Sequence, residues 1–129
     1  MIVGSGIDVI EISRVARALA RHRGRFAARV FTDRERAACE RFARPASHFA
    51  LRFAAKEALM KAVGTGWAHG VRWADIEVIA GAGGARAELQ LHGRVAELAA
   101  ARGAARLHLA LSRSRTHALA VVLCEGAGS

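Results

Sequence analysis

The stretch FAAKEALMKAVGTG, residues 53–66, places three charged side chains in an otherwise apolar helical pattern. Alanine, leucine and methionine favour a helix, and the glycines at positions 64 and 66 are typical of a helix end. Glu57 and Lys61 are four residues apart, so they share one face of this helix. Because ions are seldom buried without partners, this pair needs an explanation beyond the helix itself.

A helical wheel separates two groups of charges on this helix, at about 100° per residue. His48, Arg52 and Lys56 fall on one edge, where we expect an ordinary solvated face. Glu57 and Lys61 fall elsewhere, among apolar neighbours. One interpretation is a surface pair that stabilises the helix by about 0.2–0.5 kcal/mol. The other is a functional site.

The residues before this helix predict a strand and two shorter helices. Residues 2–10 alternate as a strand does. Ser13 is expected to cap a helix that runs to about residue 22. Thr32 and Glu35, three residues apart, form a capping-box pattern for a second short helix.

After the glycines the hydrophobic period changes from helical to two. This change predicts two hairpins separated by one helix, with strands at 75–80 and 87–91, a helix at about 93–102, and strands at 106–112 and 117–123. The predicted order is one strand, three helices, a strand pair, a helix and a second strand pair. We therefore expect a single α+β domain over residues 1–129, with a mostly antiparallel sheet packed against a long central helix and shorter helices.

The composition is that of a folded globular protein, with 53% hydrophobic residues in a chain of 129. No apolar run approaches the roughly 18 residues of a membrane span, and residues 1–10 lack the basic start of a signal peptide. These features predict a cytoplasmic protein with no membrane segment. Cys39 and Cys124 belong to no CxxC motif and are expected to be reduced thiols.

The formal charge of +9 comes from 20 basic against 11 acidic residues, and 18 of the basic residues are arginine. Codon usage rich in arginine and alanine explains part of this excess of positive charge. The rest indicates an anionic partner, which is a nucleic acid, an acidic protein or a phosphorylated small molecule. Nucleic acid is the weakest of these, because the chain has seven aromatic residues, no tyrosine and no recognisable nucleic-acid-binding motif.

A second carboxylate favours the functional interpretation of Glu57. Asp8 lies between Ile7 and Val9 in the predicted first strand, where aspartate is disfavoured. It could instead cap the helix that follows. Together, Asp8 and Glu57 suit a hard cation such as Mg²⁺, which takes few protein oxygens and keeps sites for water and phosphate. Lys61 would then contact a phosphate.

At the level of motifs, GIDVIEISR (residues 6–14) and FAAKEALMKAVGTG (53–66) resemble the holo-acyl-carrier-protein synthases, the small 4′-phosphopantetheinyl transferases of bacteria. DIEV (75–78) and HLALSRSRTHALAVVL (108–123) fall where that family has its later strands. The resemblance covers nearly the whole chain in order. It implies the 4′-phosphopantetheinyl transferase-like fold.

The resemblance also implies an activity and its partners. Members of this family move the phosphopantetheine arm of coenzyme A onto a serine of an acidic apo-acyl carrier protein, release adenosine 3′,5′-bisphosphate and serve fatty acid biosynthesis. Asp8 and Glu57 match the family's Mg²⁺ ligands, and Lys61 matches the lysine near the pyrophosphate. The serine proton could pass to a water molecule at the metal or to Glu57. The family is typically a homotrimer with active sites between subunits.

Several further positions are expected to bind coenzyme A, namely Arg52, Gly64, Arg86, Ser112 and Arg113 beside Lys61. Two of these regions depart from the family pattern. Gly84, Ala85 and Arg86 stand where relatives usually have Gly-Lys-Pro, and Ser112 and Arg113 stand where they usually have Ser-His. Both departures concern coenzyme A contacts rather than metal ligands.

Three arginines in the first predicted helix suggest a carrier-binding surface. Arg14, Arg17 and Arg21 share one edge by three- and four-residue spacing, either as a solvated face or as a docking stripe for an acidic helix. In the family, the position of Arg14 faces the carrier. Two other functions stay open: a transferase for a polyketide or peptide carrier, and a basic nucleic-acid-binding module. The module would leave Asp8 and Glu57 unexplained.

Overall fold

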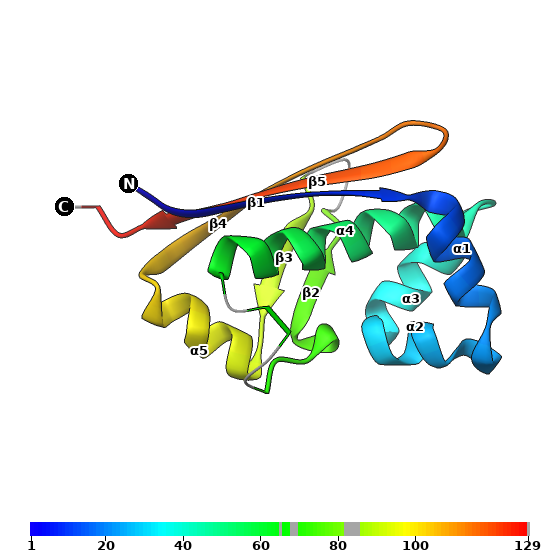
Figure 1. Cartoon of the computed structure of the whole chain (residues 1–129), viewed down its shortest axis with the longest axis horizontal. Helices are drawn as coiled ribbons and strands as arrows, with labels where there is room; N and C mark the ends of the chain where they lie inside the picture. The colour runs from blue at the N-terminus through cyan, green and yellow to red at the C-terminus, as the bar shows by residue number, and fades with distance from the viewer. Residues whose placement is uncertain (65, 68–69, 82–85, 129) are drawn as a thin grey trace.

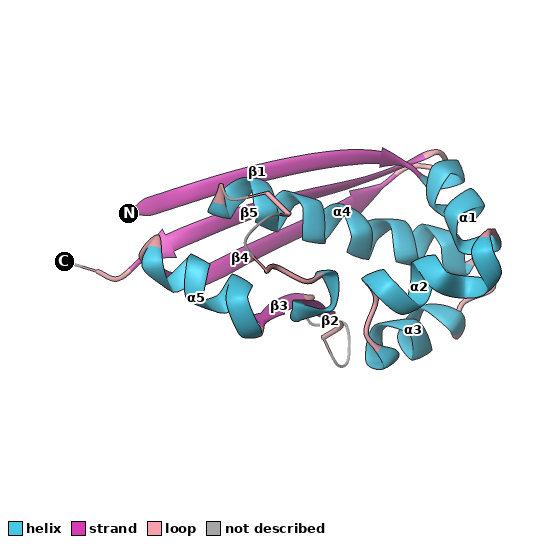
Figure 2. Cartoon of the chain, turned by 60° about the horizontal axis from the view of Figure 1, so that its bottom comes forward, coloured by secondary structure: helices cyan, strands magenta, loops and turns pink. Residues whose placement is uncertain are grey.

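The computed structural model describes residues 1–64, 66–67, 70–81 and 86–128. The long strands form one layer, with the helices and a small hairpin on one side of it (Figure 1), and Figure 2 shows the chain turned by 60° so that its bottom comes forward. The elements in chain order are β1 (Ile2–Glu11), α1 (Ile12–Ala20), α2 (Arg25–Val30), α3 (Asp33–Glu40), α4 (Pro45–Val63), β2 (Ile76–Ile79), β3 (Glu88–Leu91), α5 (Gly93–Ala101), β4 (Ala104–Arg113) and β5 (His117–Gly126).

The strands form two antiparallel sheets. The larger sheet has the order β1-β5-β4, and β2 pairs with β3 in a separate two-stranded sheet. This arrangement confirms the predicted α+β class and both predicted strand pairs. The turn expected at residues 81–84 falls mostly outside the described residues.

The sequence-based prediction was wrong in two details of the helical region. Among the described residues, four α-helices precede β2 instead of the predicted three, because the six-residue α2 is too short to show a helical period. Ser13 does not cap α1, which begins at Ile12 directly after β1 and ends at Ala20. The Ile12 N–H donates to the Thr116 carbonyl at 2.8 Å, so backbone from the β4–β5 turn replaces a side-chain cap.

The predicted capping box at the start of α3 and the predicted glycine end of α4 are both confirmed. Thr32 and Glu35 form the complete capping box at the start of α3. Pro45 occupies the first turn of α4, and Gly64 ends that helix in the left-handed conformation, with φ of 82°. Glycine adopts this conformation without the steric cost that a side chain adds.

Alternation along β1 separates an inner from an outer face. Gly6 is buried and Asp8 is half-buried on the face toward α4, whereas Ile7 and Val9 point outward and are 55% and 59% exposed. Gly4 and Gly6 permit a close contact with α4, because a Cβ on either glycine would overlap a carbonyl oxygen of that helix. The strand backbone therefore lies directly against the helix backbone.

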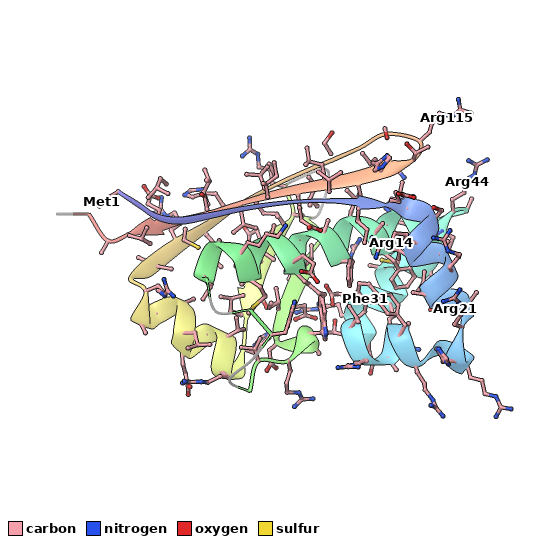
Figure 3. The ribbon with its side chains drawn as sticks, viewed as in Figure 1. Met1, Arg14, Arg21, Phe31, Arg44 and Arg115 are labelled. Carbon is pink, nitrogen blue, oxygen red and sulfur yellow. The ribbon has the colours of Figure 1, made fainter. Side chains whose placement is uncertain are left out.

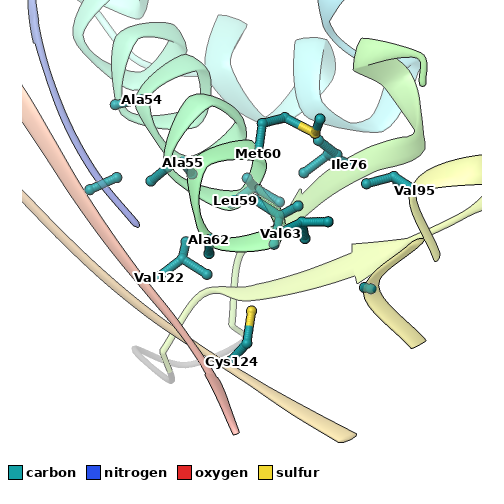
Figure 4. Packing of buried hydrophobic residues seen from close by; sticks show 14 residues of the cluster. Ala54, Ala55, Leu59, Met60, Ala62, Val63, Ile76, Val95, Val122 and Cys124 are labelled. Atoms are coloured by element: carbon teal, nitrogen blue, oxygen red, sulfur yellow. The ribbon is translucent and has the colours of Figure 1, made fainter. Parts of the chain in front are cut away.

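The main hydrophobic core lies beneath the central part of the sheet (Figure 4). Leu59 and Val63 of α4 are buried beside Ile76 of β2, Val95 of α5 and Val122 of β5. The helix is thus covered on several sides, which explains why its apolar residues follow no single stripe. In the described ranges, no helix is long and apolar enough to cross a bilayer. Cys39 and Cys124 are free and buried, and burial raises the pKa of the Cys39 thiol to about 11.

The predicted solvated edge of α4 is wrong for Lys56 and Arg52. The Lys56 side chain is completely buried, and Arg52 is only 7% exposed. Lys56 Nζ donates to Glu35 Oε1 at 2.8 Å and to the backbone carbonyls of Trp73, at 3.1 Å, and Ile76. The helical wheel did not show this, because α3 and β2 cover that edge and supply the partners.

Glu35 of α3 is bonded to β2 as well as to Lys56 of α4. Besides the ion pair, its carboxylate accepts from the Thr32 N–H and from the Val78 N–H, each at 3.0 Å. Burial lowers the pKa of Lys56, and the neighbouring Glu35 carboxylate opposes this effect. The pair is thus hydrogen-bonded on both sides, as a buried ion pair must be if it is to be tolerated.

We predict that Lys56→Met lowers the free energy of unfolding by about 3–5 kcal/mol, because it leaves the Glu35 carboxylate buried without its counter-ion. Urea unfolding followed by circular dichroism measures this change. The matched control is Lys61→Met, since the Lys61 side chain is 54% exposed and should contribute about 1 kcal/mol or less. Equal losses in the two variants would contradict a special role for the buried pair.

Candidate functional site

The contact between β1 and α4 brings Asp8 and Lys61 together from distant parts of the chain. Lys61 Nζ donates to Asp8 Oδ1 at 3.1 Å and to the Ile7 carbonyl at 3.0 Å. Asp8 is largely covered, with 16% of its side chain exposed, whereas Lys61 reaches solvent. Asp8 therefore points from the sheet to the helix, as the sequence-based interpretation requires.

Glu57 completes this cluster one turn before Lys61. It is half-buried, and burial is the main cause that raises the pKa of its carboxyl. The Trp67 indole N–H and the charge of Lys61 lower that pKa, while the charge of Asp8 raises it. Asp8 and Glu57 are thus near enough to repel each other. Two adjacent carboxylates with incomplete compensation favour a bound cation.

The chemistry of these donors fits Mg²⁺. Both side chains offer hard carboxylate oxygens. Among the described residues, no group of three or more acidic, histidine or cysteine side chains lies close enough together to hold a metal ion, so these two carboxylates have no third protein ligand of that kind. A site with two protein carboxylates leaves positions for water and for phosphate oxygens, which is the coordination that Mg²⁺ commonly adopts in proteins.

A basic cavity of about 850 Å³ lies at the N-terminal end of α4. Its lining includes Arg44, Ser47, Arg113 and Arg115, and Arg113 Nη1 donates to Ser47 Oγ. The N-terminus of a long helix adds a partial positive charge to that of the arginines. The cavity therefore suits an anionic group.

Arg52 extends the positive region along α4, and His48 lies beside it. Arg52 Nη1 donates to the His48 carbonyl at 3.3 Å, and the buried Arg52 Nε has no hydrogen-bond partner in the described part of the chain. Burial lowers the pKa of His48, and the charges of Arg113 and Arg52 lower it further. A field that disfavours a protonated histidine favours a bound anion.

The structure does not bring all the predicted coenzyme A residues into one site of a single chain. Ser47, which holds Arg113, and Lys61 are separated along α4 by about 20 Å, at roughly 1.5 Å per residue. Ser112 pairs with Leu119 on the outer face of the sheet, whereas Arg113 pairs with the buried Ala118 on the inner face.

The other predicted contacts also lie apart. Arg86 lines a separate cavity of about 330 Å³ beside β4, and Gly64 lies at the end of α4 near the Arg102 guanidinium. Gly84 and Ala85 lie outside the described residues. The residues predicted to bind coenzyme A thus do not form one closed pocket within the described part of a single chain.

The predicted docking stripe lies at one end of the molecule. Arg14, Arg17 and Arg21 are all exposed. Figure 3 places two of them at the same end as two arginines of the basic cavity; the labelled residues are Arg14, Arg21, Arg44 and Arg115. No local pattern indicates that Arg44, Ser47 and Arg115 lie around the same cavity as Arg113, because they come from different segments that only the fold brings together.

A model of the 4′-phosphopantetheinyl transferase superfamily matches residues 4–122. The chain belongs to this superfamily. A holo-[acyl-carrier-protein] synthase of Methylobacterium radiotolerans is 50% identical to it, over 97% of this chain and 94% of that protein. The corresponding protein of Koribacter versatilis is 43% identical, over 97% and 99% of the two chains.

Solved structures of holo-[acyl-carrier-protein] synthases also align with the chain over nearly its whole length. The holo-[acyl-carrier-protein] synthase of Neisseria meningitidis aligns with a TM-score of 0.86 and 32% identity, over 97% of this chain and 99% of that one. The synthase of Bacillus anthracis, solved in complex with coenzyme A (3′,5′-ADP), aligns with a TM-score of 0.80 and 36% identity, over 98% and 99%. These comparisons confirm the predicted resemblance, the predicted fold and the predicted class of enzyme, a holo-[acyl-carrier-protein] synthase.

Proposed function

We propose that this chain transfers the 4′-phosphopantetheine moiety of coenzyme A to a serine of an apo-acyl carrier protein, with Mg²⁺ as cofactor and adenosine 3′,5′-bisphosphate as the second product. The observation that carries the proposal is the cluster of Asp8, Glu57 and Lys61, which the β1–α4 contact assembles in a chain of this superfamily. Its relatives support coenzyme A and the carrier protein as substrates.

In this proposal, the three clustered side chains have different roles. Asp8 and Glu57 hold the cation, which when bound supplies positive charge to the pyrophosphate of coenzyme A. Lys61 lies at the exposed edge of the cluster, so its ammonium can contact a phosphate oxygen. The serine proton can pass to Glu57 or to a water molecule at the site.

The basic cavity is proposed to hold the nucleotide end of coenzyme A. Arg113 stands where relatives usually have histidine, which holds a phosphate best when protonated, below about pH 6.5. Arginine stays charged at all physiological pH values and can donate two parallel hydrogen bonds to phosphate. We therefore assign Arg113 to the 3′-phosphate, with Arg44, Arg52 and Arg115 adding positive charge.

An apolar outer face supports the proposed homotrimer with active sites between subunits. Ile7 and Val9 of β1 lie opposite Val121 and Leu119 of β5 on the side of the sheet that carries no helix (Figure 1). Exposed apolar patches of this kind commonly mark protein–protein contacts. Ser112 lies on the same outer face of the sheet. In the proposed homotrimer, association of subunits through this face would place Ser112 at an active site between subunits.

The preferred carrier is proposed to be the acyl carrier protein of fatty acid biosynthesis in the cytoplasm. A polyketide or peptide carrier is the main alternative, and trials against several apo-carriers separate the two. A basic nucleic-acid-binding module would instead show a steep dependence of affinity on salt and no modification of an apo-carrier.

We predict that the apo-carrier gains the phosphopantetheine mass when it is incubated with the protein, coenzyme A and Mg²⁺, as mass spectrometry measures. Asp8→Asn and Glu57→Gln should each abolish this gain, because each removes the charge of a metal ligand without changing its size. Circular dichroism should show an intact fold in both variants.

The control for these two variants is Asp33→Asn, which neutralises a fully exposed carboxylate in α3. It should keep the activity of the unchanged protein. A near-native rate for Glu57→Gln at low Mg²⁺ would show that the assignment of the metal ligands is wrong.

We predict that charge reversal at Arg14 and Arg21 raises the KM for the carrier protein much more than the KM for coenzyme A. Attraction between an arginine stripe and an acidic helix acts over the protein surface, so the difference between variant and unchanged protein should shrink as salt is added. Steady-state kinetics with each substrate varied in turn, at low and high salt, measure the effect. Equal changes in the two KM values would argue against the stripe.

We predict that Arg113→Ala raises the KM for coenzyme A about tenfold with little change in kcat, because it removes charge-assisted hydrogen bonds to the 3′-phosphate. Dephospho-coenzyme A, which lacks that phosphate, should be used equally by the variant and the unchanged protein. Kinetics with the two substrates, repeated across pH 6–8, test this role. If Arg113→Ala weakens both substrates alike, Arg115 or Arg86 becomes the better candidate.

A further inference from the structure

Ser47, in the first turn of α4, connects the start of that helix to the end of β4. The residue is buried, with 8% of its surface exposed. Its hydroxyl donates to the Arg44 carbonyl at 3.1 Å, and Arg113 Nη1 of β4 donates to the Ser47 oxygen. A hydroxyl has one hydrogen to donate and two lone pairs that accept. Because the hydrogen of Ser47 is directed at Arg44, its lone pairs are left for Arg113.

The bond to Ser47 holds the Arg113 guanidinium without neutralising it. A guanidinium has five N–H donors, and this bond uses one of those on Nη1. None of the ion pairs in the described part of the chain includes Arg113. Its charge and its other donors are therefore available to an anion in the cavity of about 850 Å³, which Arg113 and Ser47 both line.

A neutral partner suits an arginine that binds phosphate. A carboxylate in the place of the Ser47 hydroxyl would pair with the guanidinium and weaken its attraction for an anion. The hydroxyl restricts the side chain and leaves its charge unchanged. An arginine that is already held in one orientation loses less conformational freedom when it binds a phosphate.

We propose that Ser47 is a positioning residue for Arg113: its hydroxyl holds the guanidinium in the orientation in which the remaining N–H groups bind the 3′-phosphate of coenzyme A. This inference rests on the proposed assignment of Arg113 to that phosphate. Arginine is longer and more flexible than the histidine that relatives usually have at this position. The buried hydroxyl of Ser47 gives the longer side chain a fixed point.

The test measures nucleotide binding without catalysis. Adenosine 3′,5′-bisphosphate carries the 3′-phosphate of coenzyme A, and adenosine 5′-phosphate lacks it. We expect Ser47→Ala to weaken binding of the bisphosphate about fivefold and to change binding of the monophosphate less than about twofold, as isothermal titration calorimetry measures. The matched control is Ser13→Ala, which removes an exposed hydroxyl of α1 and should change neither affinity.

A double-mutant cycle distinguishes a positioning role from a direct one. Arg113→Ala alone should weaken binding of the bisphosphate about tenfold. If Ser47 acts through Arg113, then Ser47→Ala should add less than about a twofold loss in the Arg113→Ala background. In steady-state kinetics, Ser47→Ala should raise the KM for coenzyme A while kcat and the KM for the carrier protein stay close to those of the unchanged protein. Thermal unfolding of each variant reports general damage to the fold, which would weaken binding of both nucleotides.

The outcomes separate this inference from the function it rests on. Weaker bisphosphate binding in Arg113→Ala together with unchanged binding in Ser47→Ala would overturn the positioning role alone. An undiminished effect of Ser47→Ala in the Arg113→Ala background would overturn it as well, because Ser47 would then act independently of the arginine. Equal losses for the two nucleotides in Ser47→Ala would attribute the effect to the start of α4 rather than to the 3′-phosphate, which also contradicts the inference. Unchanged bisphosphate binding in Arg113→Ala would overturn the assignment of Arg113 and the positioning role with it.

Discussion

The backbone contact between β1 and α4 is the constraint on which the site depends. Two residues of a strand advance by about 6.6 Å and four residues of a helix by about 6 Å, so the steps from Gly4 to Gly6 and from Ala62 to Ala58 nearly match. Each glycine lies against the carbonyl of the alanine opposite it. Because the two elements run in opposite directions side by side (Figure 1), this match fixes which helix residues meet Asp8.

Most of the fold could be predicted from local patterns. The alternation of β1, the capping box at Thr32 and Glu35 and the glycine stop at Gly64 are short-range signals, and the structure has all three. The exposure of α4 could not be predicted in this way. Lys56 follows the spacing of a solvated edge, but its hydrogen-bond partners Glu35, Trp73 and Ile76 lie 17 to 21 residues away in the chain. Short-range patterns contain no information about such partners.

The residues of the candidate site likewise divide into those that local patterns reveal and those that only the fold brings together. Asp8, Glu57 and Lys61 could be named because a carboxylate in a strand and charges on an apolar helix are locally anomalous, and the structure brings the three together. The basic cavity could not be assembled from the sequence, since each of its arginines resembles any other in a chain with 18 of them.

The burial of Lys56 has a practical consequence for the surface chemistry of the chain. Lys56 and Lys61 are the two lysines of the sequence, and the first is enclosed with its ammonium hydrogen-bonded to Glu35. Apart from the terminal amine, an acylating reagent therefore meets one primary amine on the folded chain, and that amine lies beside Asp8. Covalent labelling at lysine becomes a site-directed reaction without any engineering, and the extent of labelling at Lys61 reports directly on what occupies the neighbourhood of the two carboxylates.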